Sequence, residues 1–260
     1  MALHKYGWKP DKPDIRDKNY TVIKPRTLKS VNLPSVFELR ETMPPIRNQG
    51  ELGSCTGQSA ITAAMFVRMK QNEVPAFVPS ALFNYYNTRA AEGTIKEDAG
   101  AEIRNAIKAI AKMGFCPEEE WPYVEEKFKK RPPASAYKSA SQYKAFEYFR
   151  LNNENITELK TCIASGYPFV FGFTVYTTIE QAETNGGIIP LPTVNDTTDG
   201  GHAVVCCGYN DEKKLFTIHN SWGTDVGDKG YYYMPYEYVT NTQLSDDFWT
   251  IRKIEETDNK

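Results

Sequence analysis

The hydrophobic pattern of this chain changes near residue 143, and that change constrains the fold more than any other feature. Before it, apolar residues recur at the three- and four-residue spacing of helices, over residues 56–72, 80–91 and 100–113. After it come one helical pattern over residues 155–166 and four runs of β-branched and aromatic residues, over 168–176, 202–210, 214–223 and 230–236. The sequence therefore predicts an α+β chain with a helical part over residues 33–142 and a β-rich part over residues 143–260.

Composition excludes several classes of protein. The chain has 260 residues, enough to bury a sizeable core, and its 40% hydrophobic residues and net charge of −2 are typical of globular proteins. Its longest basic block is Lys129–Arg131, which is too short for the positive surface of a nucleic-acid binder. No apolar run approaches the ~18 residues that span a bilayer. We therefore expect no nucleic-acid partner and no membrane partner.

The cysteines indicate a reducing compartment. There are five of them, at positions 55, 116, 162, 206 and 207, without the paired spacing of a disulfide framework. The N-terminus lacks the apolar core of a signal peptide. We expect a cytoplasmic or otherwise reduced monomer. Because the histidines and cysteines lack metal-ligand spacing, we expect no metal and no other cofactor.

Cys55 is the first candidate for chemistry, because it begins the helical pattern of residues 56–72 directly after a helix-capping residue, Ser54. A thiol with a pKa near ~8.5 is mostly protonated at neutral pH, and a helix N-terminus or a cationic imidazole favours the thiolate. His202 in "GGHAVVCCGY" and Asn220 in "HNSWG" can supply an imidazole and an amide that fixes its tautomer. Gln49 can donate a hydrogen bond to an oxyanion. Together these residues predict thiol catalysis of acyl transfer.

The motifs around these residues resemble those of the papain-like cysteine peptidases. "RNQGELGSC", "GGHAVVCCGYN" and "HNSWGTDVGDKGYYYM" stand in that family's order, and the resemblance covers residues 33–250. It implies a papain-like fold of two lobes, one helical and one β-barrel-like, with the active site in the cleft between them. It also implies that Cys55 is the nucleophile, His202 the general base and acid, Asn220 the orienter of the imidazole and Gln49 the oxyanion donor.

The resemblance further implies how a peptide or protein substrate is bound. Gly100 and Ala101 stand where the family hydrogen-bonds an extended substrate backbone, and Gly201 directly precedes the catalytic histidine. Trp222 would shield the catalytic asparagine from water. Asp246 and Asp247 fall near the far end of the pocket for the second substrate side chain upstream of the cut, where an acid favours a basic side chain. The alternative is a solvated loop acid.

The chain departs from the family pattern at several positions. Thr56 stands where an aromatic residue is usual, and Val226 replaces a second tryptophan. Leu52 and Asp98 stand where the family has the two cysteines of a disulfide, which agrees with a reducing compartment. None of these changes deletes a reacting group.

Residues 1–32 are rich in proline and charge, and predict an extended arm rather than a packed element. The arm is much shorter than the globular pro-segment usual in this family. Two interpretations stay open. In the first, the arm lies over part of the surface with Tyr6 and Trp8 as anchors, and it either restrains access to the active site or is removed. In the second, it is a structural belt.

Three functions stay open as well. The leading one is hydrolysis of peptide bonds through a Cys55 thioester. The second is an exopeptidase or acyl transferase that uses the same catalytic residues. The third is a peptide-binding module without catalysis, which the intact catalytic residues disfavour.

Overall fold

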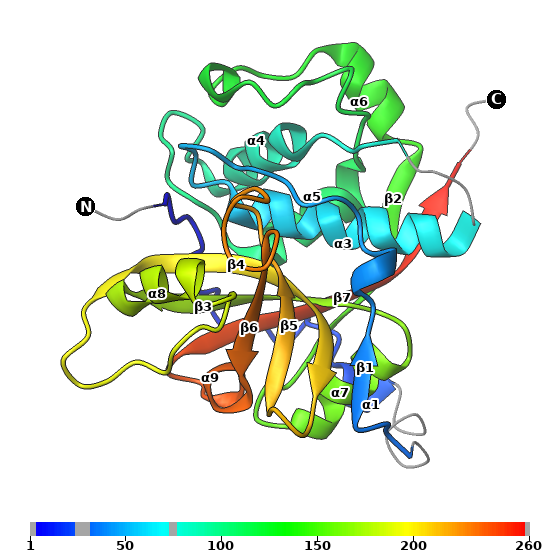
Figure 1. The fold of residues 1–260 in the computed structure, drawn as a ribbon. Coiled ribbons are helices and arrows are strands. Elements are labelled where there is room, and N and C mark those ends of the chain that lie inside the picture. The colour runs from blue at the N-terminus through cyan, green and yellow to red at the C-terminus, as the bar shows by residue number, and fades with distance from the viewer. Residues whose placement is uncertain (1–3, 24–31, 73–76, 258–260) are drawn as a thin grey trace.

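The computed structural model describes residues 4–23, 32–72 and 77–257. Helices gather on one side of the molecule and an antiparallel sheet on the other, and the longest helix runs between them (Figure 1). The helices of the first half are α3 (Cys55–Asn72), α4 (Ala81–Glu92), α5 (Ile103–Met113) and α6 (Ala134–Ala140). The helices expected over residues 56–72, 80–91 and 100–113 are thus confirmed, each within three residues of its expected start.

Local sequence explains where these helices begin and end. The Ser80 side chain accepts a hydrogen bond from the Phe83 N–H and caps α4. Helix α5 buries a stripe that includes Ile103, Ile107 and Ile110, and it ends at Gly114, which adopts the positive φ that favours glycine. Helix α3 is buried around most of its circumference, because it packs against both the sheet and the other helices.

The sheet comes mostly from the second half of the chain. Its strands are β1 (Val36–Glu38), β2 (Tyr143–Arg150), β3 (Phe169–Tyr176), β4 (Thr198–Asn210), β5 (Leu215–His219), β6 (Tyr231–Pro235) and β7 (Ser245–Glu256). They pair antiparallel in the order β2-β7-β3-β4-β5-β6, with β1 paired to the far end of β4. The four strands expected from sequence are confirmed, and β1, β2 and β7 are additional.

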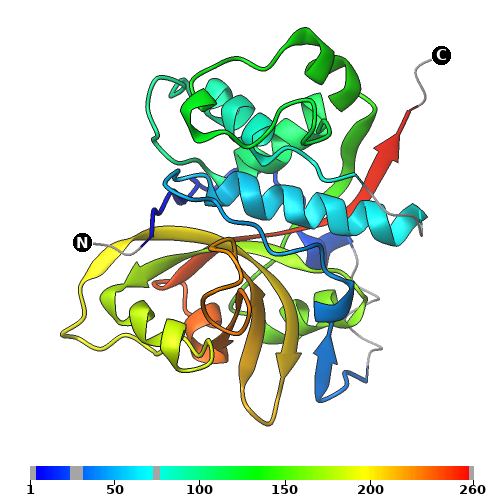
Figure 2. The same ribbon diagram turned by 45° about the horizontal axis from the view of Figure 1, so that its top comes forward.

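Short elements join these strands on the periphery of the sheet, as Figure 2 shows. They are α7 (Ile156–Ala164), the 3₁₀ turn η3 (Thr177–Ile179), α8 (Glu180–Thr184) and α9 (Tyr236–Thr240). Two further 3₁₀ turns lie elsewhere: η1 (Arg40–Thr42) follows β1, and η2 (Glu125–Lys127) lies between α5 and α6. One apolar core runs from α3 and α5 into the sheet, and a smaller one lies under α4 and α6. No helix of the described residues is long and apolar enough to cross a bilayer.

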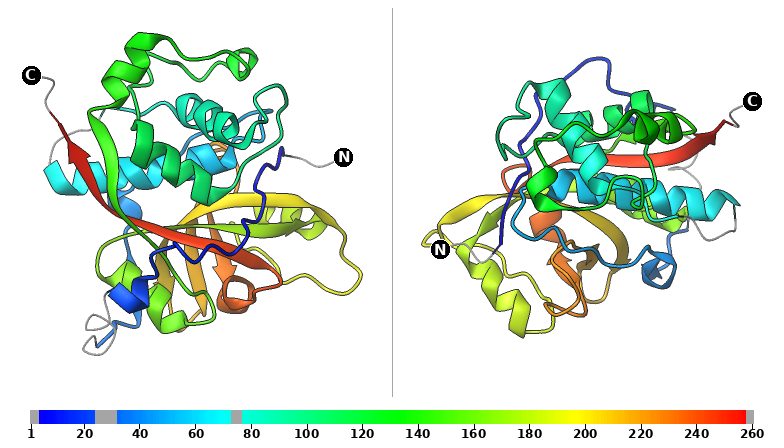
Figure 3. Two further views of the ribbon diagram at one scale, coloured as in Figure 1. Left: turned by 180° about the vertical axis from the view of Figure 1, so that it is seen from behind. Right: turned by 90° about the horizontal axis from the view of Figure 1, so that it is seen from above.

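The N-terminal arm crosses the molecule before the first strand. Its described residues run between the helices and the sheet and then along β7 to the short helix α1 (Tyr20–Ile23), as the left view of Figure 3 shows. The expectation of an unpacked arm needs correction, because Trp8 and Tyr20 are buried and Tyr20 begins a helical turn. The residues 1–3 and 24–31 of the expected arm lie outside the described part of the chain.

Candidate active site

Cys55 is the first residue of α3 and is completely buried. The turn that precedes it is held by Asp98, whose carboxylate accepts hydrogen bonds from the Gly53 N–H at 2.9 and 3.1 Å. The Tyr85 hydroxyl donates to the same carboxylate and accepts a hydrogen bond from the Gly100 N–H. Asp98 therefore joins, through hydrogen bonds, the two segments where the family pattern has a disulfide that this chain lacks.

His202 lies on β4, where the register places it opposite Phe173 of β3. Its Nε2 is 2.7 Å from Oδ1 of Asn220, and the same amide oxygen accepts the Ser221 N–H at 2.8 Å. Because Oδ1 accepts, Nε2 carries the proton and Nδ1 is left with its lone pair. Nδ1 has no hydrogen-bond partner among the described residues, which leaves it available as a base.

Trp222 covers this pair. Its ring stacks on the imidazole of His202 with centroids 4.5 Å apart, and its other neighbours include His4 of the arm, stacked at 4.1 Å. Asn220 is 5% exposed, so the contact between its amide and the imidazole is kept from water. This is the shielding position that the resemblance implied for Trp222.

Gln49 is fully buried beside the nucleophile helix. Its side-chain oxygen accepts a hydrogen bond from the Ser221 hydroxyl at 2.8 Å, which turns the amide nitrogen toward the cleft. That nitrogen donates to the Leu52 carbonyl and to the Lys5 carbonyl, each at 2.9 Å. A carbonyl oxygen of the arm therefore occupies the position where the sequence predicts an oxyanion.

The arm residues 4–9, called the latch below, continue across the cleft as an extended strand. Trp8 pairs with Ala101 in a parallel bridge: the Ala101 N–H donates to the Gly7 carbonyl at 2.8 Å, and the Lys9 N–H donates to the Ala101 carbonyl at 3.1 Å. On the opposite wall, the Trp8 N–H donates to the Gly201 carbonyl at 2.8 Å. The latch thus uses the backbone groups that the sequence assigns to substrate.

Burial controls the protonation of Cys55 and His202 in this structure. Burial raises the pKa of the Cys55 thiol to about 11, and the N–H groups of Gly7 and Ala203 that face the sulfur offset only part of that shift. Burial lowers the pKa of His202 to about 3. Both groups are therefore neutral at pH 7. The sequence predicts a thiolate favoured by the helix N-terminus, and under the latch desolvation outweighs that effect.

The indole of Trp8 is buried against strands β3, β4 and β7 of the sheet, in what is called the Trp8 pocket below. Its ring lies against Gly172 and Gly201, where an added Cβ would come within 2.0 and 2.8 Å of ring atoms. Its Nε1 donates to Oδ2 of Asp247 at 2.9 Å. Asp247 is fully buried, has a left-handed backbone with φ of 59°, and lies next to Asp246 on β7.

The predicted residue Asp246 lies at the rim of this pocket. Its side chain is 49% exposed and its carboxylate is 3.2 Å from Nη2 of Arg150. It lines a groove beside Trp8 and Pro10 on the arm. The buried acid at the end of the Trp8 pocket is its neighbour Asp247.

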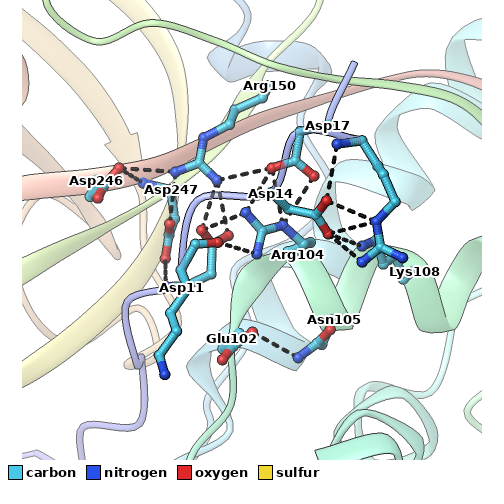
Figure 4. A network of polar contacts seen from close by, with 12 residues as sticks. Asp11, Asp14, Asp17, Glu102, Arg104, Asn105, Lys108, Arg150, Asp246 and Asp247 are labelled. Carbon is cyan, nitrogen blue, oxygen red and sulfur yellow. Dashed lines mark hydrogen bonds and ion pairs between the residues drawn. The ribbon is translucent and has the colours of Figure 1, made fainter. Parts of the chain in front are cut away.

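A buried network of charges ties the next part of the arm to both halves of the molecule (Figure 4). Residues 11–20 are called the strap below. Arg104 of α5 donates to Asp11 and Asp17 of the strap at 2.8 and 2.7 Å. Arg150 of β2 also donates to Asp11 at 2.8 Å and reaches Asp247 of β7 at 3.1 Å. The strap therefore bridges a helix of the first half and two strands of the second.

Sequence reasoning missed several residues of this region: Asp11, Arg104, Arg150 and Ser221. It named Asp247 with Asp246 as candidate pocket acids in "LSDDFW", and it named Asp98 at a disulfide position of the family. The missed residues act through partners far away in the sequence, as Asp11 and Arg150 do. Such pairings are not visible in local patterns.

Comparisons with known proteins agree with the motifs. Residues 33–248 match the model of a family described as "Papain family cysteine protease". The chain is 43% identical to xylellain, a cysteine protease from Xylella fastidiosa, and the two structures match over 99% of each chain with a TM-score of 0.88. An uncharacterized peptidase C1-like protein of Acanthamoeba polyphaga mimivirus is 38% identical over 271 residues, 96% of this chain and 87% of that protein.

More distant proteins share the fold or parts of the sequence. A procathepsin B from Trypanosoma congolense is 18% identical and has a TM-score of 0.76 over 97% of this chain and 87% of its own. Peptidase 1 of Dermatophagoides farinae is 27% identical over 218 residues, 79% of this chain. This chain spans 62% of the length of that mite protein.

Proposed function

This chain belongs to the papain family of cysteine proteases, which are hydrolases, and from that premise we propose that Cys55, His202, Asn220 and Gln49 hydrolyse peptide bonds through a thioester. Nδ1 of His202 takes the thiol proton as the sulfur of Cys55 bonds to the substrate carbonyl carbon. The amide of Gln49 stabilises the resulting oxyanion. The imidazolium then protonates the leaving amine as the C–N bond breaks.

The second half of the reaction uses the same groups. A water molecule gives a proton to Nδ1 of His202 while its oxygen attacks the thioester carbonyl, and the Cys55 sulfur leaves with that proton returned to it. Asn220 keeps Nε2 protonated throughout and so holds the imidazole in one tautomer. No group beyond these residues and water is needed to balance the reaction.

One observation carries this proposal: a peptide already lies in the site. The Lys5 carbonyl oxygen is 2.9 Å from the Gln49 amide nitrogen, while the Gly7 N–H faces the Cys55 sulfur. A site that binds a backbone carbonyl at this donor, next to a thiol and an imidazole, suits acyl transfer from a peptide.

We also propose that the latch inhibits the enzyme. It forms hydrogen bonds with the backbone groups of Ala101 and Gly201 that a substrate would need, and it keeps the catalytic thiol protonated. In the open enzyme the same groups, with Gly100 beside them, would bind an extended substrate. Trp222 would remain as the cover over the catalytic imidazole.

The Trp8 pocket favours one kind of substrate side chain. We propose that it takes the second side chain upstream of the cut, because Trp8 is the latch residue bonded to Gly201 next to the catalytic histidine. Asp246 at its rim and Asp247 at its end favour a basic side chain there.

The experiment compares peptide hydrolysis by the wild-type chain, Cys55→Ala and Cys116→Ala, each with and without residues 1–9. We expect Cys55→Ala to abolish hydrolysis in both forms, since the nucleophile is lost. Cys116→Ala is the matched control, a buried thiol in the smaller core. Mass spectrometry should place one iodoacetamide adduct on Cys55 in the active forms. Undiminished hydrolysis by Cys55→Ala would refute the proposal.

A further inference from the structure

We propose that Asp11, a residue of the N-terminal arm, is a specificity-determining residue of the active enzyme: the strap stays bound when the latch opens, and the Asp11 carboxylate makes the Trp8 pocket select a cationic side chain. This inference rests on the proposed function, because it concerns the substrate of that site. It treats residues 11–20 as part of the substrate-binding wall rather than as a removable segment.

The strap is built into the folded domain. Tyr20 is completely buried and packs edge-on against Phe149 of β2, with ring centroids 6.1 Å apart. The Arg150 N–H donates to the Lys18 carbonyl at 2.8 Å, which adds the strap to the edge of β2. Arg104 donates to the Lys12 carbonyl at 2.7 Å. Removing the strap would expose these groups and leave two arginines without their carboxylates.

The latch is attached differently. Its contacts with the cleft include backbone hydrogen bonds of the kind a substrate can replace, at Gln49, Ala101 and Gly201, besides the packing of the Trp8 indole and the His4 ring. Among the described residues its one ion pair joins His4 to Glu183 and needs a protonated imidazole. Pro10, which is exposed, separates the latch from the strap. The latch can therefore exchange with substrate while the strap keeps its buried contacts.

When Asp247 is ionised, the strap leaves the buried network with one negative charge in excess. Three buried carboxylates, those of Asp11, Asp17 and Asp247, face two guanidiniums, those of Arg104 and Arg150. Side-chain exposure is 0 to 7% for the carboxylates and Arg104, and 19% for Arg150, so solvent screens these charges little. Asp11 lies at the centre, 2.8 Å from both arginines, and its N–H donates to Asp247.

The excess charge lies next to the Trp8 pocket, on the carboxylate of Asp247. Its Oδ2 accepts the Trp8 indole N–H and the Asp11 N–H, each at 2.9 Å, and its Oδ1 faces Arg150. Burial raises the pKa of Asp247 to about 7, and the Asp11 carboxylate adds to that shift. When the latch opens, the Trp8 donor is lost. A lysine or arginine side chain would supply a donor together with the missing positive charge.

The remaining charges near the pocket do not cancel this excess. Asp246, on the same strand, is negative and half exposed. Asp14 of the strap faces away from the pocket: it pairs with Arg16 at 2.6 Å and lies 3.7 Å from Lys108. Asp14 is therefore a matched control for Asp11, with the same side chain in the same segment.

The experiment uses the chain without residues 1–9 and two peptides that differ only at the second residue upstream of the cut, arginine or its neutral isostere citrulline. We expect kcat/KM to favour arginine. Asp11→Asn should lower the arginine-to-citrulline ratio on the order of tenfold, because one charge is removed from a poorly screened network. Asp14→Asn should leave the ratio unchanged, and Asp11→Glu should restore most of it.

The outcomes separate this inference from the proposed function. A folded truncated chain that cleaves neither peptide contradicts the proposed function. Cleavage of both, with the same ratio in Asp11→Asn and the parent, overturns the role of Asp11. If Asp11→Asn does not fold, Asp17→Asn removes one charge from the same network, and an unchanged ratio in that folded variant equally overturns the inference.

Discussion

At the scale of single residues, Gly7 shows how closely the latch fits the cleft. A Cβ built on Gly7 would lie 1.8 Å from the Gly53 carbonyl oxygen, a distance that no real contact allows. Gly53 belongs to the turn before the nucleophile helix and is held by Asp98, so it cannot move away easily. The latch can therefore close over the cleft only because Gly7 has no side chain.

The Gly7→Ala variant should open the latch without altering the cleft. Overpacking typically costs 1–3 kcal/mol, so we expect roughly a tenfold rise in the rate at which iodoacetamide labels Cys55. The full-length chain is labelled at pH 7 and the adduct is followed by mass spectrometry. Ile15→Ala is the control, because Ile15 is a fully exposed arm residue. Equal rates in Gly7→Ala and the parent would show that the latch does not limit access.

The proposed reacting groups are the residues that sequence identified most directly. Each is a polar side chain in an apolar or glycine-rich stretch, and the structure brings His202 to Asn220 and Gln49 to the start of α3. Asp247 was harder to identify, because its burial depends on a left-handed residue within β7 and on Arg150 from another strand. Sequence indicates that an acid is present there, and only the fold shows which of two neighbouring acids is buried.

At the scale of elements, the arm has two parts with different roles. The latch lies in the cleft and the strap lies on the domain, as the left view of Figure 3 shows. The two interpretations left open by the sequence, restraint of access and structural belt, therefore apply to different segments of one arm. Composition alone could not divide them, since prolines and charges occur in both.

Stepwise truncation should separate the two roles. Removal of residues 1–9 should lower the melting temperature less than removal of the whole arm, because the strap contacts remain. Removal of residues 1–20 deletes buried Tyr20 and the carboxylates that face Arg104 and Arg150, at a cost of about 3–5 kcal/mol. That corresponds to a fall of roughly 10 °C in Tm, measured by calorimetry. Equal melting temperatures for the two truncations would contradict the division.

The helices were easier to predict than the strands for a physical reason. The apolar stripe of α5 and its terminal Gly114 are local features, so both were found. Strands β2 and β7 pair with each other through contacts about a hundred residues apart, and both carry many charged residues. β1 has three residues and exists through its pairing with β4. Such strands are specified by their partners more than by their own composition.

At the scale of the whole molecule, the expected papain-like α+β fold is confirmed by the match to xylellain. The helical and β-rich parts were assigned from periodicity alone, and the structure has helices on one side and the sheet on the other (Figure 1). Sequence could not show that residues from the arm, α5, β2 and β7 share one buried network. That network makes the stability of the whole chain sensitive to pH.

The sign of this pH dependence follows from Asp247. Its pKa in the folded chain is raised to about 7, against ~3.9 when unfolded, so the folded state holds a proton that the unfolded state releases. Stability from this group is complete below pH ~4 and is lost as the pH rises to about 7, by up to ~4 kcal/mol. Asp247→Asn should flatten this decline.

Urea unfolding of the full chain at pH 4, 5.5 and 7 measures the effect. Asp246→Asn is the control. The Asp246 carboxylate is half exposed, so its removal should leave the slope of stability against pH as it is in the parent. If the free energy of unfolding of the parent chain rises from pH 4 to pH 7 by as much as that of Asp247→Asn, then Asp247 is not the origin of the slope.

The covalent link between the latch and the strap has a consequence for how inhibition responds to concentration. Because the strap keeps the latch beside its own binding site, the inhibition we propose would make the latch an intramolecular competitor with a local concentration in the millimolar range, as for short tethers in general. Dilution cannot relieve such inhibition, and no second molecule is needed to impose it. The activity of this protease would be set by how well each substrate competes with six residues of its own chain.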